Sequence, residues 1–410
     1  MERSAVGGGG GRSRALTVAL CFAVAVLEGF DIQALGVAAP KLAPEFGLAA
    51  SRMGWIFAIS NVGLVIGASF GGWLADRFGR KPVFIAAVAT FGVFTLATPL
   101  ISGFNSLFAL RFFAGLGFGA ALPNMMALAA EISPPERRAS TAATMFCGMP
   151  LGGGTSALLT QLLPPDFDWR TLFVIGGLLP LIIVPAMHFL MPETLQRAGH
   201  SAEPRANVAQ VLFGGGRAIP SLLLWLTFLP TLLILYLILN WLPTLAIANG
   251  LSRASAPLSS LAFNFASVAG ALLLGRIVDR FGARWPLTLA YAALIASLVA
   301  LGGAHGLNAI VICSAAAGFF LMGANYALYG VAATYYPQEM RGTGSGASVA
   351  IGRIGSIAGP LLAGVLLGGG TSAANVVFYM APVAALAGLA VFSLGFFSPT
   401  VPPPRTGGGQ

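Results

Sequence analysis

Long apolar runs, each of about 20 residues and separated by short polar turns, dominate the pattern along the chain. A helix needs roughly 20 apolar residues to cross the hydrocarbon core of a bilayer, because each residue advances it by only about 1.5 Å. The pattern therefore predicts an all-α membrane protein with twelve transmembrane helices. The expected spans are 15–39, 53–75, 82–101, 104–130, 139–163, 170–191, 219–248, 256–278, 285–304, 307–334, 343–367 and 375–397.

The longest polar stretch lies between the sixth and seventh runs and divides the chain into two halves of similar length. An even number of spans places both termini on the same side of the membrane. The expected organisation is a cytoplasmic tail (1–14), an N-terminal six-helix bundle (15–191), a cytoplasmic central loop (192–218), a C-terminal six-helix bundle (219–398) and a second cytoplasmic tail (399–410).

The two halves repeat one another. Residues 72–81, after the second span, and 275–284, after the eighth, both read G-x-x-x-D-R-F-G-x-(R/K), at an offset of 203 residues. Two bundles related by pseudo-symmetry are a transporter plan in which the substrate site lies between the halves near the bilayer midplane. The same offset relates a second loop motif, Pro134, Glu136 and Arg138, to Pro337, Glu339 and Arg341.

Composition and charge agree with a lipid environment. Hydrophobic residues make up 57% of the chain and charged residues only 9%, with a mean hydropathy of +0.84. The net charge of +9 follows topology, since 16 of the 22 lysines and arginines fall in the tails and even-numbered loops and four in the other loops. Cationic loops stay in the cytoplasm, so this bias predicts cytoplasmic termini and argues against a nucleic-acid partner.

Several kinds of chemistry have no signature in the sequence. There is no Walker A motif to bind ATP, no nucleophile–histidine–acid set and no spacing typical of a metal site. The three cysteines lie in apolar runs, where they read as small packing residues. We therefore expect no enzyme activity, no cofactor, no metal and no obligate protein partner.

Two acidic residues, Glu28 and Asp31, lie inside the first span. Each charge costs about 2.5–3.5 kcal/mol at the membrane centre, so such residues face a bundle interior or a wet cavity and carry function. Their spacing places them on one helix face, where repulsion and burial both oppose the charged form. We expect Asp31 to carry a proton and Glu28 to tune it. The alternative is a permanent ion pair with Arg111 in the fourth span.

Arg353 lies near the middle of the eleventh span, and no acidic residue occurs in the spans of the C-terminal half. A guanidinium binds carboxylates through two parallel hydrogen bonds, so Arg353 is expected to bind a substrate carboxylate. The competing interpretation is a charge bridge between the halves. For Arg111, partnering Asp31 and contacting substrate remain equally open.

Amide and aromatic side chains occur together inside the seventh and tenth spans. They suit a flat aromatic ligand with a hydroxyl group, through ring stacking and one or two hydrogen bonds. Ordinary helix packing is the alternative for each of them. The candidates are Asn240, Trp241, Asn325, Tyr326 and Tyr329.

The repeated loop motif combines an aspartate with basic residues at the cytoplasmic ends of the second and eighth spans. Positive charge alone would orient the protein, but orientation does not require the recurring aspartate. We expect the loops to hold the bundles in one state and to release them in another. The candidate gating residues are Gly72, Asp76, Arg77, Gly79, Arg80, Asp279, Arg280 and Gly282.

These motifs resemble the major facilitator superfamily over nearly the whole chain. The twinned loops, Arg111 with the glycines that follow it, and Pro192-Glu193-Thr194 carry the resemblance. Glu28-Gly29-Phe30-Asp31 is similar to the acidic motif of the aromatic acid:proton symporters, which usually has Asp in place of Glu28. With 240–243 (NWLP) and 352–355 (GRIG), the chain is most similar to the 3-(3-hydroxyphenyl)propionate transporters of Gram-negative bacteria.

The resemblance implies proton-coupled uptake of an aromatic carboxylate across the bacterial inner membrane by alternating access. Its expected partners are the small acid, protons and the lipid bilayer. Proton-coupled efflux and symport of hydroxybenzoate- or benzoate-type acids are the alternatives within transport. A membrane sensor that binds without transporting, and a membrane-embedded enzyme, are weaker alternatives.

Overall fold

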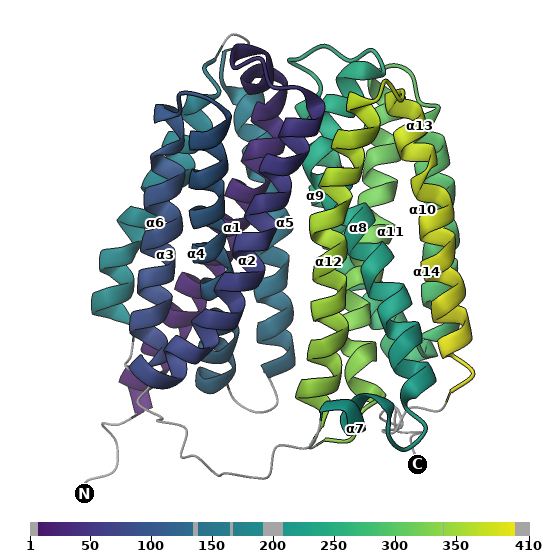
Figure 1. Ribbon diagram of the computed structural model, residues 1–410. Coiled ribbons are helices and arrows are strands. Elements are labelled where there is room, and N and C mark those ends of the chain that lie inside the picture. Colours follow the sequence, from purple (N-terminus) through teal and green to yellow (C-terminus); the bar gives the residue numbers. More distant parts are fainter. Residues whose placement is uncertain (1–6, 134–137, 165–166, 192–207, 339, 398–410) are drawn as a thin grey trace, which may run out of the picture. The chain divides into compact units, whose positions relative to one another are not determined.

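The structure, a computed structural model, describes residues 7–133, 138–164, 167–191, 208–338 and 340–397. Within these ranges the secondary structure is helical and contains no β-strand. The chain forms two compact units, Met1–Ser201 and Ala202–Gln410, hereafter the N-terminal and C-terminal units. The division falls inside the expected central loop, 192–218, and Figure 1 shows the helices of each unit standing side by side.

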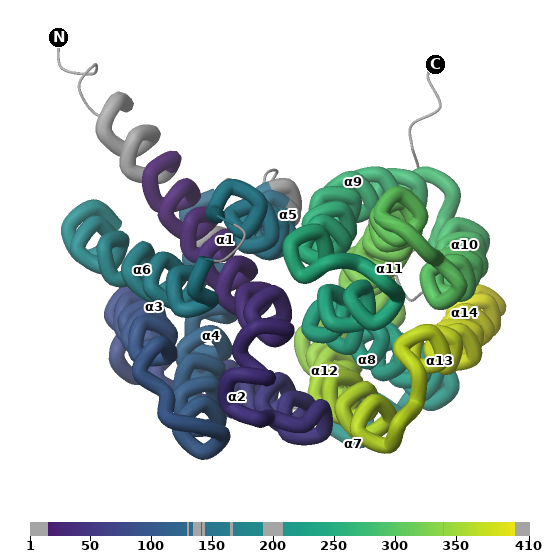
Figure 2. Tube along the Cα trace, turned by 90° about the horizontal axis from the view of Figure 1, so that it is seen from above, coloured from purple at the N-terminus to yellow at the C-terminus, as the bar shows by residue number. Residues whose placement is uncertain are grey.

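In the N-terminal unit, α1 packs against α5 and α6, while α4 packs against α2 and α3 (Figure 2). Its buried core joins α1, α3 and α4 through apolar side chains such as Cys21, Phe91 and Phe118. The elements of this unit are α1 (Gly7–Glu45), α2 (Ala50–Phe78), α3 (Arg80–Leu96), the 3-10 helix η1 (Thr98–Leu100), α4 (Phe104–Ile132), α5 (Arg138–Leu162) and α6 (Arg170–Leu190).

In the C-terminal unit, α9 packs against α11, α8 against α12, and α10 against α14. The short α7 lies inside the stretch expected as the central loop. The elements are α7 (Val208–Phe213), α8 (Ala218–Ala248), α9 (Pro257–Phe281), α10 (Arg284–Gly302), α11 (Leu307–Thr334), α12 (Arg341–Gly368), α13 (Ala373–Phe378) and α14 (Met380–Leu394).

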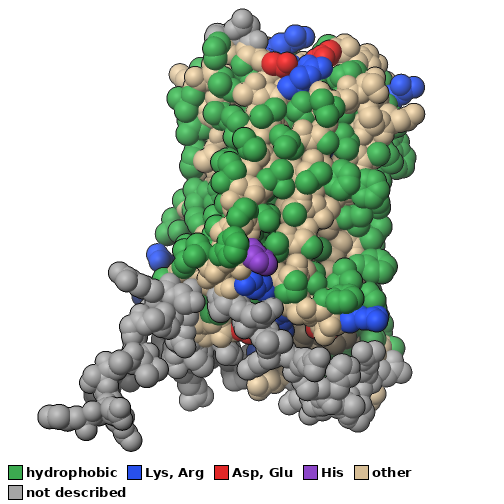
Figure 3. All heavy atoms as spheres, turned by 90° about the vertical axis from the view of Figure 1, so that its left-hand side faces the viewer, with side chains coloured by type: hydrophobic (Ala, Val, Ile, Leu, Met, Phe, Trp, Pro, Cys, Tyr) green, Lys and Arg blue, Asp and Glu red, His purple; other side chains and the backbone are tan. Residues whose placement is uncertain are grey.

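The twelve expected spans correspond to α1–α6, α8–α12 and the pair α13–α14. Within the described residues, eleven of these are long and apolar enough to cross a membrane. The remaining one, α5, spans 25 residues but is rich in glycine, serine and threonine, which lowers its apolar content. Hydrophobic side chains cover the middle of the face in Figure 3, and charged side chains gather toward its ends.

Some expected features lie outside the described residues in whole or in part. They are the tail 1–14, the motif 134–138, Glu339, the loop 192–207 with Pro192-Glu193-Thr194, and the tail 399–410. Within the first tail, described helical backbone begins at Gly7.

The internal repeat extends from the loops to the contacts between helices. A Cβ added to Gly152 on α5 would lie 1.8 Å from the carbonyl oxygen of Val26 on α1. At the same offset of 203 residues, a Cβ on Gly355 of α12 would lie 2.1 Å from the carbonyl oxygen of Leu229 on α8. Small residues let helix backbones approach closely, so both units use the same device at the same place.

The α2–α4 and α9–α11 pairs repeat in the same register. A Cβ on Gly67 would lie 2.2 Å from the carbonyl oxygen of Leu116, and one on Gly270 would lie 2.0 Å from that of Phe319. Each of these residues is 203 positions from its counterpart. The repeat predicted from two loop motifs is therefore a repeat of the packing within each unit.

The motif glycines close the turns between helices. Gly79, between α2 and α3, has φ of 97°, and Gly282, between α9 and α10, has φ of 79°. Side chains with a Cβ rarely adopt positive φ, so each turn requires glycine. This gives a physical reason for two of the residues in the repeated motif.

Candidate functional site

The N-terminal unit contains a buried ion pair between α1 and α4. The Arg111 Nη1 donates to Asp31 Oδ2 at 2.9 Å, and the side chains are 2% and 1% exposed. A charge at such depth is tolerated when it has a partner of opposite sign. The structure thus brings together the two residues that the sequence left either as partners or as separate proton and substrate groups.

The remaining contacts of Arg111 come from helices that the sequence did not implicate. Its Nη2 donates to the Thr98 hydroxyl on η1 at 2.8 Å and lies 3.5 Å from the Thr95 hydroxyl on α3. Its guanidinium carbon lies 5.2 Å from the centroid of the Phe173 ring on α6. Four elements of one bundle therefore converge on this cation.

The pair leaves hydrogen-bonding capacity unused. Among the described residues, Asp31 Oδ1 and Arg111 Nε are buried and have no hydrogen-bond partner. A single Nη1–Oδ2 bond is weaker and less directional than the two-bond arrangement that a guanidinium and a carboxylate can form. Protonation of Asp31 would remove the ionic part of this contact and leave Arg111 with its threonine contacts.

Glu28 lies one turn before Asp31 on α1 and is fully buried. The intervening Gly29 is pressed against α5, since a Cβ there would lie 1.9 Å from the Met149 carbonyl oxygen. This close contact fixes the rotation of α1 and so determines where both carboxylates lie.

In the C-terminal unit, the half-buried Arg353 on α12 donates from Nη1 to the Tyr236 hydroxyl on α8 at 2.9 Å. Tyr329 on α11 lies within electrostatic range of both residues. Its ring packs edge-to-face on Phe228, with centroids 5.5 Å apart. Arg353 therefore sits among aromatic side chains from α8 and α11.

The two candidates on α8 take part in structural contacts. Asn240 Nδ2 donates to the Tyr236 carbonyl oxygen, one turn earlier, at 2.6 Å. The Trp241 indole donates to the Pro360 carbonyl oxygen on α12 at 3.1 Å, and the ring is almost fully buried. Trp241 therefore links α8 to α12, as the packing interpretation requires, and a role in substrate binding stays a prediction.

On α11, Asn325 and Tyr329 are one turn apart and share a helix face. Asn325 is 4% exposed, and its Oδ1 is buried with no hydrogen-bond donor among the described residues. Tyr326 is half-buried on the same helix. A buried amide oxygen without a donor is costly, and a hydroxyl of a bound molecule could satisfy it.

The loop motifs show contacts within each unit. Arg80 forms an ion pair with Glu131 on α4, while the guanidinium of Arg77 lies over the rings of Trp73 and Phe78. Arg280 lies 5.3 Å from the Phe281 ring centroid. The carboxylates of Asp76 and Asp279 make no hydrogen bond or ion pair with a described residue, and a Cβ on Gly72 would meet open space. The gating role stays a prediction.

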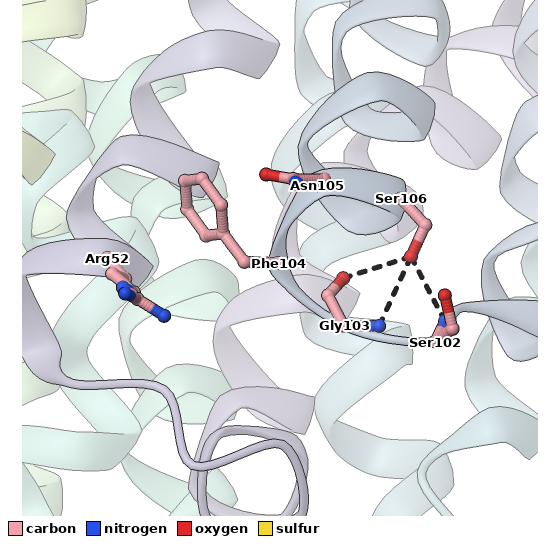
Figure 4. A pocket seen from close by; sticks show the side chains of 6 residues that line it. All are labelled: Arg52, Ser102, Gly103, Phe104, Asn105 and Ser106. Carbon is pink, nitrogen blue, oxygen red and sulfur yellow. Dashed lines mark hydrogen bonds between the residues drawn. The ribbon is translucent and has the colours of Figure 1, made fainter.

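A separate pocket of about 490 Å³ opens where α4 begins (Figure 4). Arg52 at the start of α2 lines it together with the segment 102–106, and its guanidinium carbon lies 5.8 Å from the Phe104 ring centroid. The Ser106 hydroxyl bonds the Gly103 backbone and closes this turn. The pocket lies about two helical turns along α4 from Arg111, so it is distinct from the buried pair.

No metal centre is apparent in the part of the chain that the structure describes. It contains no group of three or more histidine, cysteine, aspartate or glutamate side chains that could hold an ion. The three cysteines are free thiols.

Sequence reasoning missed Thr98, Phe173 and Tyr236. Tyr236 could have been found, because it precedes Asn240 by one helical turn on a face already singled out. Thr98 and Phe173 carry no local signal, since they reach Arg111 only when η1 and α6 pack beside α4.

Comparison with known proteins gives a family. The model of the Major Facilitator Superfamily matches residues 21–301 and 224–410. The 3-(3-hydroxy-phenyl)propionate transporter of Escherichia coli (strain K12) is 41% identical over 381 residues, covering 92% of this chain and 93% of the relative. The 4-hydroxybenzoate transporter PcaK of Pseudomonas aeruginosa is 34% identical, and the match covers 93% of this chain and 92% of that transporter. The gallate transporter of Pseudomonas putida is 34% identical, and the match covers 86% of this chain and 85% of that transporter.

Solved structures share the fold. A D-xylose-proton symporter superposes with a TM-score of 0.77 at 17% identity, covering 95% of this chain and 98% of that one. A bacterial homologue of the lysosomal transporter Spinster gives 0.77 at 16% identity, covering 95% and 99%. The chain belongs to the major facilitator superfamily, a superfamily of transporters and not of enzymes, and within it to the family that includes the 3-(3-hydroxy-phenyl)propionate, 4-hydroxybenzoate and gallate transporters.

Proposed function

We propose that this protein takes up an aromatic carboxylate, such as 3-(3-hydroxyphenyl)propionate, together with protons across the bacterial inner membrane by alternating access. The observation that carries the proposal is the buried Asp31–Arg111 pair beside Glu28. The relatives named above are transporters of aromatic acids and support the class of substrate. The positive-charge bias supports cytoplasmic termini.

Asp31 is the proposed proton carrier. Protonation would neutralise the carboxylate and break the ionic contact with Arg111, whose other donors remain on Thr98 and Thr95. Charge movement at one buried pair can bias a two-state equilibrium, because the two protonation states favour different packing around Arg111. Glu28, one turn away on α1, is a second buried acidic group beside the proposed carrier.

Arg353 is the proposed ligand of the substrate carboxylate. Its Nη1 donates to the Tyr236 hydroxyl, a neutral acceptor that a carboxylate would outcompete. The Asn325 amide oxygen is a suitable acceptor for a phenolic hydroxyl, and Tyr329 offers a ring face. Asn240, Trp241, Tyr326 and Arg111 remain further candidates for substrate contact.

The repeated loops are the proposed gating elements, which would bias the equilibrium between conformations. The Arg80–Glu131 pair supports this assignment, because it ties α3 to α4 at the end of the helices where the motif lies. The glycine turns at Gly79 and Gly282 provide matching geometry in the two units.

Transport assays in proteoliposomes with an imposed pH gradient test the central claim. Labelled 3-(3-hydroxyphenyl)propionate should accumulate against its gradient when the outside is acidic. Asp31→Asn should abolish accumulation but retain substrate exchange at equal pH. Asp168→Asn, which removes an exposed carboxylate of the same unit, is the matched control and should accumulate normally.

Three outcomes would contradict the proposal. Accumulation by Asp31→Asn equal to that of the unmodified protein would exclude Asp31 as the proton carrier. Outward movement driven by an inward proton gradient would establish efflux instead. Arg353→Lys with unchanged substrate affinity would exclude the carboxylate contact.

A further inference from the structure

Arg284, the first residue of α10, lies in an aromatic cluster at one end of the C-terminal unit. Its guanidinium carbon is 3.7 Å from the ring centroid of Phe396, 4.4 Å from that of Phe392 and 5.5 Å from that of Trp285. The rings also pack edge-to-face on one another, with Phe392 5.7 Å from Trp285 and 5.4 Å from Phe396. The cation is therefore held by rings.

The stem of Arg284 is fixed as well. A Cβ added to Gly395 would lie 2.4 Å from the Arg284 Cγ, so the side chain runs directly over that backbone. Despite this fixed position, the Arg284 guanidinium makes no hydrogen bond or ion pair with any described residue, and its Nε is buried without an acceptor. A guanidinium has five N–H donors, and none of them has an acceptor in the part of the chain that the structure describes.

The equivalent cation of the N-terminal unit is satisfied differently. Lys81, 203 residues earlier, donates to the Met191 carbonyl oxygen just after α6, at 2.8 Å. The counterpart of that acceptor is the Leu394 carbonyl oxygen, which accepts the Tyr335 hydroxyl at 3.1 Å. The same oxygen also accepts the Phe397 backbone N–H at 3.1 Å, so both of its lone pairs are used and it is not open to Arg284.

The cluster lies at the boundary of the spans. One candidate span begins at Arg284 and another ends at Leu394. The cluster therefore lies at the level of the lipid headgroups. Trp285 and Phe396 are 59% and 65% exposed, as is common for aromatic side chains at that level. Arg280, in the last turn of α9, adds a second positive charge. The positive-charge bias assigns this end to the cytoplasm.

We propose that Arg284, with Trp285, Phe392 and Phe396, binds the phosphate of an anionic phospholipid in the cytoplasmic leaflet. The guanidinium donors match phosphate oxygens, and the exposed rings offer apolar surface to the glycerol and upper acyl chains. A free inorganic phosphate would satisfy the donors but would leave these rings uncovered. Charge complementarity and the position at the span ends therefore both favour a lipid.

Native mass spectrometry of the full-length protein, released from detergent with titrated phosphatidylglycerol or phosphatidylcholine, tests this assignment. We expect Arg284→Gln to lower the apparent affinity for phosphatidylglycerol about fivefold, the effect of one cation near an anionic lipid surface. Affinity for phosphatidylcholine should stay the same. Lys81→Gln is the matched control, because its ammonium is already paired with a carbonyl, and it should bind phosphatidylglycerol normally.

Two further arms keep the test decisive. Arg284→Lys retains the charge without the planar fork, so it should lie between the unmodified protein and Arg284→Gln, and it covers the case in which Arg284→Gln fails to fold. Inorganic phosphate at millimolar concentration should not displace the lipid. Equal phosphatidylglycerol affinity in the unmodified, Arg284→Gln and Arg284→Lys proteins would overturn the proposal, and displacement by phosphate would show a soluble-anion site instead.

Discussion

Arg111 on α4 and Ser314 on α11 occupy equivalent positions, 203 residues apart, in the N-terminal and C-terminal units. Arg111 forms a buried ion pair, whereas the buried Ser314 hydroxyl has no hydrogen-bond partner among the described residues. The position of Glu28 is taken by Thr231, which bonds the Tyr291 hydroxyl. The position of Asp31 is taken by the apolar Ile234, so the C-terminal unit has an isoleucine and a serine where the N-terminal unit has its charge pair.

The reverse holds for the cation of the C-terminal unit. Arg353 on α12 corresponds to Pro150 on α5, which carries no charge. The backbone contacts between helices nevertheless stay in the same register. Packing and charge therefore differ in how far they repeat: close approach between helices recurs in both units, while each unit has its own cation within a span, the buried Arg111 and the half-buried Arg353.

The largest effect is expected from breaking the charge pair of the N-terminal unit. Arg111→Gln leaves the Asp31 carboxylate buried without its cation, which should destabilise the protein by about 3–5 kcal/mol. The double variant Asp31→Asn/Arg111→Gln removes both charges and should recover most of that loss. Chemical unfolding in detergent measures both. A double variant no more stable than the single one would contradict the pair's energetic role.

Next in size is the effect of a methyl group at the α1–α5 contact. Gly29→Ala places a Cβ against the Met149 backbone, which cannot yield without separating the helices, so we expect a loss of about 1–3 kcal/mol. Gly352→Ala meets the flexible end of the Leu232 side chain and should cost less. Thermal unfolding of both variants compares them.

Gly72→Ala is the control for that series, because nothing lies within 4 Å of an added Cβ there. Its melting temperature should match that of the unmodified protein. A normal melting temperature combined with impaired transport would support a conformational role for the loop. A large loss of stability would instead contradict the open surroundings of Gly72.

A smaller effect is expected at Ser314. Removing a buried hydroxyl that lacks a partner costs no hydrogen bond, so Ser314→Ala should change the unfolding free energy by less than about 1 kcal/mol, toward greater stability. Chemical unfolding of Ser314→Ala and Arg111→Gln under the same conditions compares the loss of stability at the two equivalent positions. A loss as large as that of Arg111→Gln would show that the C-terminal unit depends on this site as well.

The smallest effect should come from the partly exposed pair Arg170–Glu45, which joins the start of α6 to the end of α1. Its counterpart position in the C-terminal unit is the uncharged Ala373. Exposed ion pairs are screened by water and salt, so Arg170→Gln should cost less than about 1 kcal/mol. Unfolding at low and high salt checks this, and a large, salt-independent loss would contradict it.

Much of the fold was predictable because its signals are local. Apolar length predicted the spans, and the repeated G-x-x-x-D-R-F-G motif predicted two related bundles that recur in the helix contacts. Helix ends were less predictable: the first span was expected to end at 39, but α1 continues to Glu45. The fifth run, 139–163, was expected as a span, but α5 is less apolar than the other helices because of its small polar residues.

The candidate site was predictable only in its ionisable members. Asp31, Arg111 and Arg353 are visible because charge is rare in apolar runs. Thr98 and Phe173 look like any other residues of such runs, and only the packing of η1 and α6 beside α4 brings them to Arg111. Arg284 was visible as a basic loop residue, but its aromatic surroundings depend on α14, about a hundred residues further along the chain.

Two equivalent helix contacts in the two units differ in which helix supplies the glycine. Between α1 and α5, Gly29 is the small partner and Met149 the large one, whereas between α8 and α12 the small partner is Gly352 and the large one Leu232. The glycine is thus on the first helix of the pair in one unit and on the second in the other, while the two helices meet at the same pair of positions. An alignment scored one column at a time records two mismatches here, but facing residues scored together reveal a single ancestral contact.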